Sequence, residues 1–460
     1  MFAVWRQSRG GRIAAAVSSG AAARVLSSLF TLVSLPLALR YLGAERFGVW
    51  ATIASTAVFL NLVDLGIAST LTNYIAHSYA VGDREYAARY MANALVLTAA
   101  AACVAGGLLA IAWPTIDWAK LFNVSSAVPP AEVSGTVAAA VALVLLGLTA
   151  SLTGRILSGY QEVHRINAIV AIGTLANLAG LLGGLALRVS MPVLFVLATG
   201  WITLSNLTVL FAMLLWKKSW LRPRLAFLEW RATRELLAAG SGFFLIQVAG
   251  AIVFSSDNVV LSHFLGPAQV TPYSVTWRVV GLTAVMQGLL FPALWPAYAE
   301  AYVRGDYAWV RRTFRITLRG TMALNLVFGA LLLAFGRTVI RWWAGASAVP
   351  SFALLGAMAL WAVISGAMTV ESCLLAAVNR TREQGVLSVF AAGLNLALSI
   401  VLVQRVGALG VIAGTILSYL IVLVVPQSLM VRSVLSEPTK SSSYDGQRVR
   451  AYPPPVSPML

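Results

Sequence analysis

The sequence predicts an all-α polytopic membrane protein of about twelve membrane-spanning helices. Three observations favour this fold class: the composition is strongly apolar, apolar runs of about 20 residues recur along the chain, and basic residues gather in alternate gaps between those runs. A bilayer offers no water to backbone N–H and C=O groups, and a helix satisfies these groups within a single segment.

The composition excludes an ordinary soluble domain. Apolar residues make up 59% of the 460 residues and charged residues only 11%, whereas soluble domains carry about 25% charged residues. The mean hydropathy is +0.83. The net charge of +17 does not indicate nucleic-acid binding, because the Lys and Arg residues fall in short gaps between apolar runs, as the positive-inside rule requires.

The apolar runs predict where the spans lie, since a helix needs about 20 residues to cross about 30 Å of hydrocarbon. Six runs in the first half of the chain are predicted spans, at 14–39, 48–78, 91–112, 133–154, 166–187 and 193–216. Six more follow, at 236–264, 273–299, 315–336, 352–378, 385–404 and 409–431. The connections between them are too short to fold as a separate domain.

Counts of Lys and Arg predict the orientation in the membrane. With the N-terminus inside, the inner segments carry 24 of the 33 basic residues and the outer segments carry 7, while Arg24 and Arg278 fall inside spans. We therefore expect a multi-pass membrane protein with both termini in the cytoplasm.

Two short motifs recur at a constant spacing. Leu42-Gly43 returns as Leu265-Gly266, and Gly82-Asp83 returns as Gly305-Asp306, in both cases 223 residues later. Each motif stands in the matching loop of its half of the chain. An even number of spans in each half predicts parallel halves, related by an axis along the membrane normal.

The repeat predicts how the chain is divided. We expect an N-terminal six-helix lobe at 1–225, a C-terminal six-helix lobe at 226–431 and a disordered cytoplasmic tail at 432–460, which is rich in Ser and Pro. Two parallel lobes are typical of transporters that rock one bundle against the other.

Charged side chains inside the first two spans are candidate functional residues, because each costs at least about 2.5–3.5 kcal/mol near the centre of a span. Arg24 offers a fork of donors that suits a diphosphate or carboxylate of the substrate. It could instead form an internal ion pair with Asp64. Asp64 could in turn bind a coupling cation, exchange a proton, or neutralise Arg24, and the neutralising role is favoured.

Further charged candidates lie in the second half of the chain. Asp257 and Arg278 are on consecutive spans near the outer surface, and their depth permits a structural or gating ion pair. Arg278 is also a candidate substrate ligand. Glu371, near the inner end of its span, is a candidate for an ion pair or for ion coupling.

The sequence shows no catalytic constellation. The three histidines, His77, His164 and His263, are scattered, and no Gly-rich phosphate loop precedes a helix. Cys103 and Cys373 lie in apolar segments and predict neither a disulfide nor a metal site. We expect a protein that is not an enzyme and holds no cofactor.

The stretch from Leu35 to Trp50 resembles the end of the first helix and the following turn of O-antigen and polysaccharide flippases. These flippases belong to the multidrug/oligosaccharidyl-lipid/polysaccharide exporter superfamily. Asp64-Leu65-Gly66, followed by Leu71-Thr72-Asn73 and Gly82-Asp83, is similar to the second helix and inner loop of that family. The likeness is specific over about residues 20–90.

The resemblance implies a flippase that carries an oligosaccharide linked to undecaprenyl diphosphate from the cytoplasmic to the periplasmic leaflet of a bacterial inner membrane. It also implies a V-shaped bundle, related to the multidrug-exporter fold, with a cationic lumen in which Arg24 corresponds to a first-helix arginine. The bilayer, H⁺ or Na⁺ as a coupling ion, and a polysaccharide polymerase or ligase are the expected partners. Two alternatives remain open: cation-coupled efflux of small molecules, and a membrane glycosyltransferase or polymerase.

Overall fold

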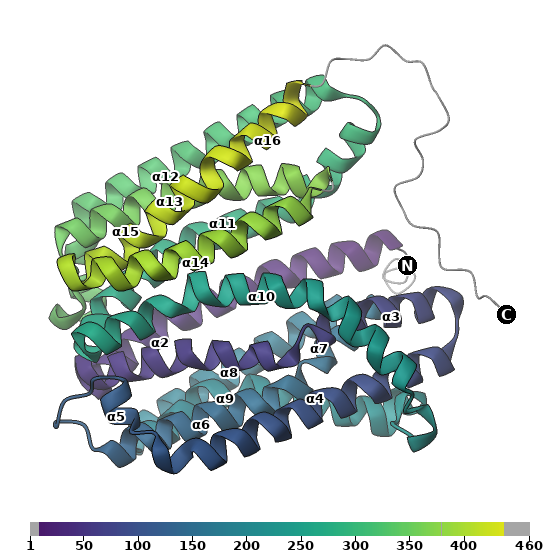
Figure 1. Cartoon of the computed structure of the whole chain (residues 1–460), viewed down its shortest axis with the longest axis horizontal. Helices are drawn as coiled ribbons and strands as arrows, with labels where there is room; N and C mark the ends of the chain where they lie inside the picture. Colours follow the sequence, from purple (N-terminus) through teal and green to yellow (C-terminus); the bar gives the residue numbers. More distant parts are fainter. Residues whose placement is uncertain (1–8, 379, 437–460) are drawn as a thin grey trace.

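The computed structural model describes residues 9–378 and 380–436, and these residues form helices and contain no strand (Figure 1). The predicted all-α fold is confirmed. The helices are α2 (Arg9–Leu60), α3 (Ile67–Val81), α4 (Arg84–Ala112), α5 (Trp118–Leu121), α6 (Pro130–Ala150), α7 (Leu152–Gly159), α8 (Val163–Ala186), α9 (Met191–Ala212), α10 (Trp230–Leu265), α11 (Pro267–Val303), α12 (Tyr307–Ala344), α13 (Phe352–Ala377), α14 (Thr381–Val406), α15 (Ala408–Tyr419) and α16 (Val425–Ser436).

Ten helical stretches of the described chain are long and apolar enough to cross a membrane. One of them, Ala22–Asp64, holds most of the predicted first span and the first part of the second, because α2 contains two helices joined at Gly43. The predicted eighth span lies within α11, which is not among the ten. All twelve predicted spans therefore fall on helical segments.

The repeated motifs share a backbone conformation as well as a sequence. Gly43 and Gly266 both have a positive φ, of 77° and 83°, at the sharp turn between the first two spans of each half, a conformation that glycine adopts without steric cost. Asp83 and Asp306 each cap the following helix, accepting a hydrogen bond from the backbone N–H three residues later at 2.9 and 3.0 Å.

The apolar core shows how the two halves of the chain meet. At the end of the bundle that holds the Gly43 turn, a single buried cluster combines residues of both halves, such as Val49 on α2 and Met358 on α13. At the opposite end, Leu71 of α3 and Val431 of α16 belong to separate buried clusters. The bundle is therefore V-shaped, joined at one end and divided at the other (Figure 1).

The start of α10 belongs to the predicted C-terminal lobe by sequence but packs with the N-terminal half. Ala232 and Leu236 belong to the buried cluster that also holds residues of α3 and α4. Further along, α10 packs against both α2 and α14. The division at residue 225 stays a prediction, and the first turns of α10 pack with the N-terminal half.

Candidate functional site

A cavity of about 430 Å³ lies in the C-terminal half, among α11, α13, α14 and the last span, which runs through α15, η7 (Leu420–Val424) and α16. Its lining combines aromatic rings, side-chain amides and hydroxyl groups, and includes no charged side chain among the residues described. Such a concave, largely apolar site with a few converging polar groups is typical of a ligand pocket. The lining residues are Trp277, Val280, Gly281, Thr283, Ala284, Gln287, Trp361, Ser365, Met368, Thr369, Ser372, Gln384, Ser388, Tyr419, Leu423 and Gln427.

Three aromatic side chains form a continuous wall of this cavity. The ring centroids of Trp277 and Trp361 lie 6.2 Å apart in a stacked arrangement, and those of Trp361 and Tyr419 lie 4.7 Å apart with perpendicular rings. Trp361 is buried and belongs to the core cluster shared by both halves. The three rings therefore pack on one another along the cavity lining, and Trp361 is held in place by the packed side chains of the core.

Amide side chains supply the polar part of the cavity. Nε2 of Gln427 donates a hydrogen bond to Oγ of Ser372 at 2.7 Å. Nε2 of Gln384 is buried and has no hydrogen-bond partner among the described residues. A buried unpaired donor costs about 1–3 kcal/mol, and a ligand with hydroxyl groups would satisfy it, because a hydroxyl both donates and accepts.

The ion pair predicted between Asp257 and Arg278 is not formed in this structure. Oδ2 of the buried Asp257 accepts a hydrogen bond from the hydroxyl of Tyr273 on α11, and Oδ1 has no hydrogen-bond partner among the described residues. The depths of the two residues in their spans permitted the pair, but the α11 side chain that reaches Asp257 is Tyr273.

Glu371 lies directly behind the cavity. Its Oε1 accepts a hydrogen bond from Oγ of Ser428 on α16 at 2.9 Å, whereas Oε2 is buried with no hydrogen-bond partner in the described part of the chain. The neighbouring residues Ser372 and Gln427 line the cavity. Glu371 is therefore placed to hold α16 against α13 at this site, and its role in ion coupling stays a prediction.

Asp64 stands at a break within the second span. After η1 (Asn61–Asp64), Leu65 and Gly66 both adopt positive φ values, of 50° and 76°, before α3 begins. The buried Oδ1 of Asp64 accepts a hydrogen bond from the backbone N–H of Ala68 at 3.1 Å, which satisfies a donor in the first turn of α3. Asp64 therefore stabilises the restart of the helix, a role the sequence did not indicate.

A basic residue on a neighbouring helix and a tight packing contact lie around this break in the second span. Arg155 on α7 lies close enough for its positive charge to attract the carboxylate of Asp64. Gly240 on α10 packs so closely that a Cβ there would come within 2.7 Å of the carbonyl oxygen of Leu65. The predicted pairing of Asp64 with Arg24 stays a prediction.

Arg24 has an exposed side chain on the N-terminal part of α2. Five residues earlier, Oγ of Ser19 accepts a hydrogen bond from Nδ2 of Asn167 on α8 at 2.9 Å. Five residues turn an α-helix by about 140° beyond one full turn, so Arg24 projects from a face of α2 other than the one that packs on α8.

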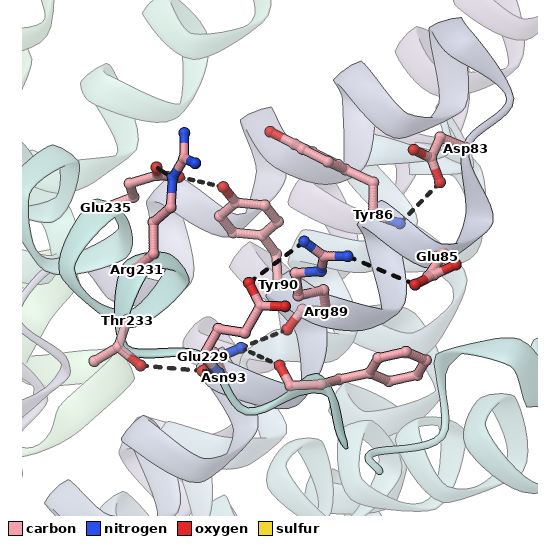
Figure 2. Close-up of polar contacts among 11 residues, drawn as sticks. Asp83, Glu85, Tyr86, Arg89, Tyr90, Asn93, Glu229, Arg231, Thr233 and Glu235 are labelled. Carbon is pink, nitrogen blue, oxygen red and sulfur yellow. Dashed lines mark hydrogen bonds and ion pairs between the residues drawn. The ribbon is translucent and has the colours of Figure 1, made fainter. Parts of the chain in front are cut away.

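A second polar cluster ties the segment between the halves to α4 (Figure 2). Asn93 on α4 accepts hydrogen bonds from the backbone N–H of Glu229 at 3.2 Å and from Oγ1 of Thr233 at 3.0 Å, and donates to the carbonyl of Phe227 at 2.8 Å. Arg89 pairs with Glu229 at 3.3 Å. These contacts hold the start of α10 in place and leave little room for a ligand.

Glu235 completes this cluster. Its carboxylate accepts hydrogen bonds from the hydroxyl of Tyr90 on α4 and from Nε of Arg231 at 3.0 Å (Figure 2). Partial burial alone would raise the pKa of Glu235, but these two hydrogen bonds and the charge of Arg231 outweigh it, so the pKa is lowered. The carboxylate of Glu235 is therefore ionised at neutral pH and can accept both hydrogen bonds.

Most of the cavity residues were missed at the sequence level. Trp361, Gln384 and Gln427 were not predicted as site residues. The available signal was the amide side chains within apolar spans, which are weaker markers than charged groups because an amide costs less to bury.

Comparison with known proteins assigns the chain to a family. The family model described as "Polysaccharide biosynthesis protein" matches residues 13–301, more than half of the chain. A "Putative O-antigen transporter" of Salmonella typhi is 25% identical over 312 residues, which cover 67% of this chain and 68% of that protein. A protein of the same name from Salmonella typhimurium is 30% identical over 96 residues, 21% of this chain and 20% of that one.

Solved structures of transporters share the fold. An inward-facing multidrug resistance MATE family transporter of the MOP superfamily superposes with a TM-score of 0.73 at 14% identity, covering 90% of this chain and 98% of that one. An outward-facing MATE family transporter of the same superfamily gives a TM-score of 0.56, with 90% of this chain and 96% of that one covered. By the family model and by its fold, the chain belongs to the polysaccharide biosynthesis protein family and has the architecture of the MOP superfamily.

Proposed function

We propose that this protein is a flippase that moves an oligosaccharide linked to undecaprenyl diphosphate from the cytoplasmic to the periplasmic leaflet of the inner membrane. The product would serve surface polysaccharide assembly, with a polymerase or ligase acting after the transfer. The family, the relatives named as O-antigen transporters and the transporter fold support this proposal.

The chemistry of the cavity lining is the observation that supports an oligosaccharide as the substrate. Sugar rings have apolar C–H faces that pack on aromatic rings, and hydroxyl groups that exchange hydrogen bonds with amides and hydroxyls. The cavity pairs an aromatic wall of Trp277, Trp361 and Tyr419 with the amides of Gln287 and Gln384. Efflux of cationic compounds would favour an acidic lining, and the described lining contains no Asp or Glu.

The shape of the bundle supports alternating access. The halves share one core at the end with the Gly43 turn and have separate cores at the other. The superposition is also closer on the inward-facing transporter, with a TM-score of 0.73 against 0.56. In the proposed cycle the glycan enters the cavity from the cytoplasm, Arg24 binds the diphosphate, and rocking of the halves opens the other side. A gradient of H⁺ or Na⁺ would drive the cycle.

Reconstituted transport tests the proposal. Purified protein in liposomes is given a fluorescent undecaprenyl-diphosphate oligosaccharide in the outer leaflet. Flipping is measured as the fraction of the label that a quencher added outside the liposomes can no longer reach. We expect flipping by the wild type and an approximately 10-fold slower rate for Gln384→Leu, because loss of one or two hydrogen bonds costs about 1–2 kcal/mol.

Gln404→Leu is the matched control. Gln404 is on the same helix and exposed, and within the described part of the chain its side chain donates a hydrogen bond only to the carbonyl of Ile400 in its own helix, at 3.0 Å. Wild-type flipping by Gln404→Leu is expected. If the wild type did not flip the substrate, the proposed function would be contradicted. If the two variants flipped at equal rates, the proposed site would be contradicted. Uptake of a cationic dye in place of the glycan would favour efflux.

A further inference from the structure

Two arginines share a cavity at the joined end of the bundle. Arg337 and Arg341 lie four residues apart in the last two turns of α12, which ends at Ala344, and so project from the same face. Together with Thr338, Val349 and Phe352 they line a cavity of about 280 Å³. By the predicted topology this end of the bundle faces the periplasm.

No carboxylate offsets these two charges. Two other basic residues at the same end have acidic partners: Arg46 pairs with Glu132, and Lys120 with Asp117, each at 3.1 Å. Among the described residues, neither arginine of the cavity takes part in an ion pair, and the described lining contains no Asp or Glu. Two like charges one helical turn apart repel each other, and a bound anion would remove that cost.

Arg337 is held in a geometry suited to an anion. Its guanidinium carbon lies 4.4 Å from the ring centroid of Phe352, and its buried Nε has no hydrogen-bond partner in the described chain. Stacking occupies the face of the guanidinium and leaves its edge, with N–H groups in a fixed fork, free for a bidentate oxyanion.

The adjoining helix ends have different effects on the cavity. Phe352 is the first residue of α13, so the positive end of that 26-residue helix forms part of the wall. Arg341, in the last turn of α12, also complements the negative end of its own helix. The helix dipole therefore explains why Arg341 stands at this position, but it does not explain the presence of Arg337.

The surface around the cavity points to a lipid as the source of the anion. Phe352 and Leu333, which line it, are 62% and 43% exposed, and nearby Trp342 is 82% exposed. Exposed apolar side chains with a Trp at the end of a span are typical of the boundary between hydrocarbon and headgroups. At that level a lipid carries its phosphate.

We propose that Arg337 and Arg341 form a binding site for the phosphate group of a membrane lipid in the leaflet at the joined end of the bundle. The site is separate from the glycan cavity and does not depend on the proposed transport. The bidentate contact is made by Arg337, and Arg341 adds the second charge.

Lipid binding to the purified full chain tests the site. The chain is titrated in neutral detergent with short-chain phosphatidylglycerol, and bound lipid is counted by native mass spectrometry. We expect saturable binding by the wild type and at least 10-fold weaker binding by Arg337→Gln with Arg341→Gln. Arg337→Lys should bind with intermediate affinity, because it keeps the charge and loses the fork. Inorganic phosphate at the same concentrations should not compete.

Arg405→Gln is the control, because Arg405 is an exposed arginine in the last turn of α14 outside this cavity. It should bind lipid like the wild type. Unchanged binding by the double variant, an equal loss in Arg405→Gln, or equally tight binding of inorganic phosphate would each overturn the proposal. Thermal unfolding of every variant checks that it is folded, and Arg337→Lys replaces the double variant if that one unfolds.

Discussion

The hydroxyl of Tyr273 on α11 donates a hydrogen bond to Asp257 on α10, and the ring of Tyr273 stacks on Trp277 at a centroid distance of 6.2 Å. Trp277 begins the aromatic wall of the cavity. A buried carboxylate is thus linked through one tyrosine to the wall of the proposed glycan site. The contact holds α10 against α11 near the end where the halves are joined.

Removing this hydroxyl should destabilise the protein. Tyr273→Phe leaves Asp257 buried with no donor from this side chain, and an unsatisfied buried group costs about 1–3 kcal/mol. We expect a lower midpoint of thermal unfolding in detergent. Tyr41→Phe is the control, because the Tyr41 hydroxyl donates to the carbonyl of Val189 at 2.8 Å from an exposed position, where water can replace it. Equal midpoints for the two variants would refute the argument.

Arg24 is predicted to bind the diphosphate of the substrate. Arg24→Ala should abolish flipping in liposomes while the protein still inserts and folds, and Arg24→Lys should retain part of the activity because it keeps the charge without the bidentate fork. Arg40→Ala, an exposed arginine on the same helix, should flip at the wild-type rate. Wild-type activity of Arg24→Ala would remove Arg24 from the site.

The two roles of Asp64 can be separated by substitution. Asp64→Asn keeps an oxygen that can accept from the N–H of Ala68, whereas Asp64→Leu does not. We expect Asp64→Leu to be less stable than Asp64→Asn by about 0.5–2 kcal/mol, the usual worth of a helix-capping contact. The comparison is made by thermal unfolding, and identical midpoints would contradict the capping role.

A double-mutant cycle tests whether Asp64 also neutralises Arg24. If the two charges interact, Arg24→Gln should restore stability lost in Asp64→Asn, with an interaction energy of about 0.5–3 kcal/mol. Effects that add within about 0.5 kcal/mol would exclude the pairing. A variant Asp64→Asn that folds and binds substrate but no longer responds to an imposed proton or sodium gradient would instead indicate ion coupling.

Glu235 should make stability depend on pH in the acid range. Because its pKa is lowered from the ordinary value of 4.5, the folded state gains stability above about pH 4.5 and loses it as the pH falls through the depressed value. The wild type should therefore lose more stability than Glu235→Gln between pH 5 and pH 3. Its side chain is 35% exposed, so the difference should be small. Glu383→Gln, at an exposed position, is the control and should behave like the wild type.

Reporter fusions can test the predicted orientation. A fusion after Ser436 should report a cytoplasmic location, and a fusion in the loop after Ala344 should report a periplasmic one. Both expectations follow from the distribution of Lys and Arg between the two sides. A periplasmic signal after Ser436 would reverse the topology, and with it the leaflet assigned to the arginine cavity.

Span positions and the turns between some of them could be predicted from the sequence because they depend on local properties. A run of about 20 apolar residues is sufficient to predict a helix in a bilayer, and the turns at Gly43 and Gly266 were recognisable because the Leu-Gly pair recurs 223 residues later. The break at Leu65 was not predicted, because a non-glycine residue with positive φ leaves little trace in composition.

Which side chains meet was decided by the tertiary structure. Depth along a helix can be counted from the sequence, but the direction in which a side chain points depends on how neighbouring helices pack. Tyr273 and Arg278 are five residues apart, and so differ by about 140° around α11; Tyr273 reaches Asp257 and Arg278 does not. The glycan cavity likewise combines residues of α11, α13, α14 and the last span, whose proximity no local pattern contains. The sequence by itself indicated that the chain lies in a bilayer, where its apolar spans fall and which family it resembles, because each follows from local composition or a contiguous motif. Packing between distant helices determined the cavity and the hydrogen-bond partners of the protein's buried charged side chains.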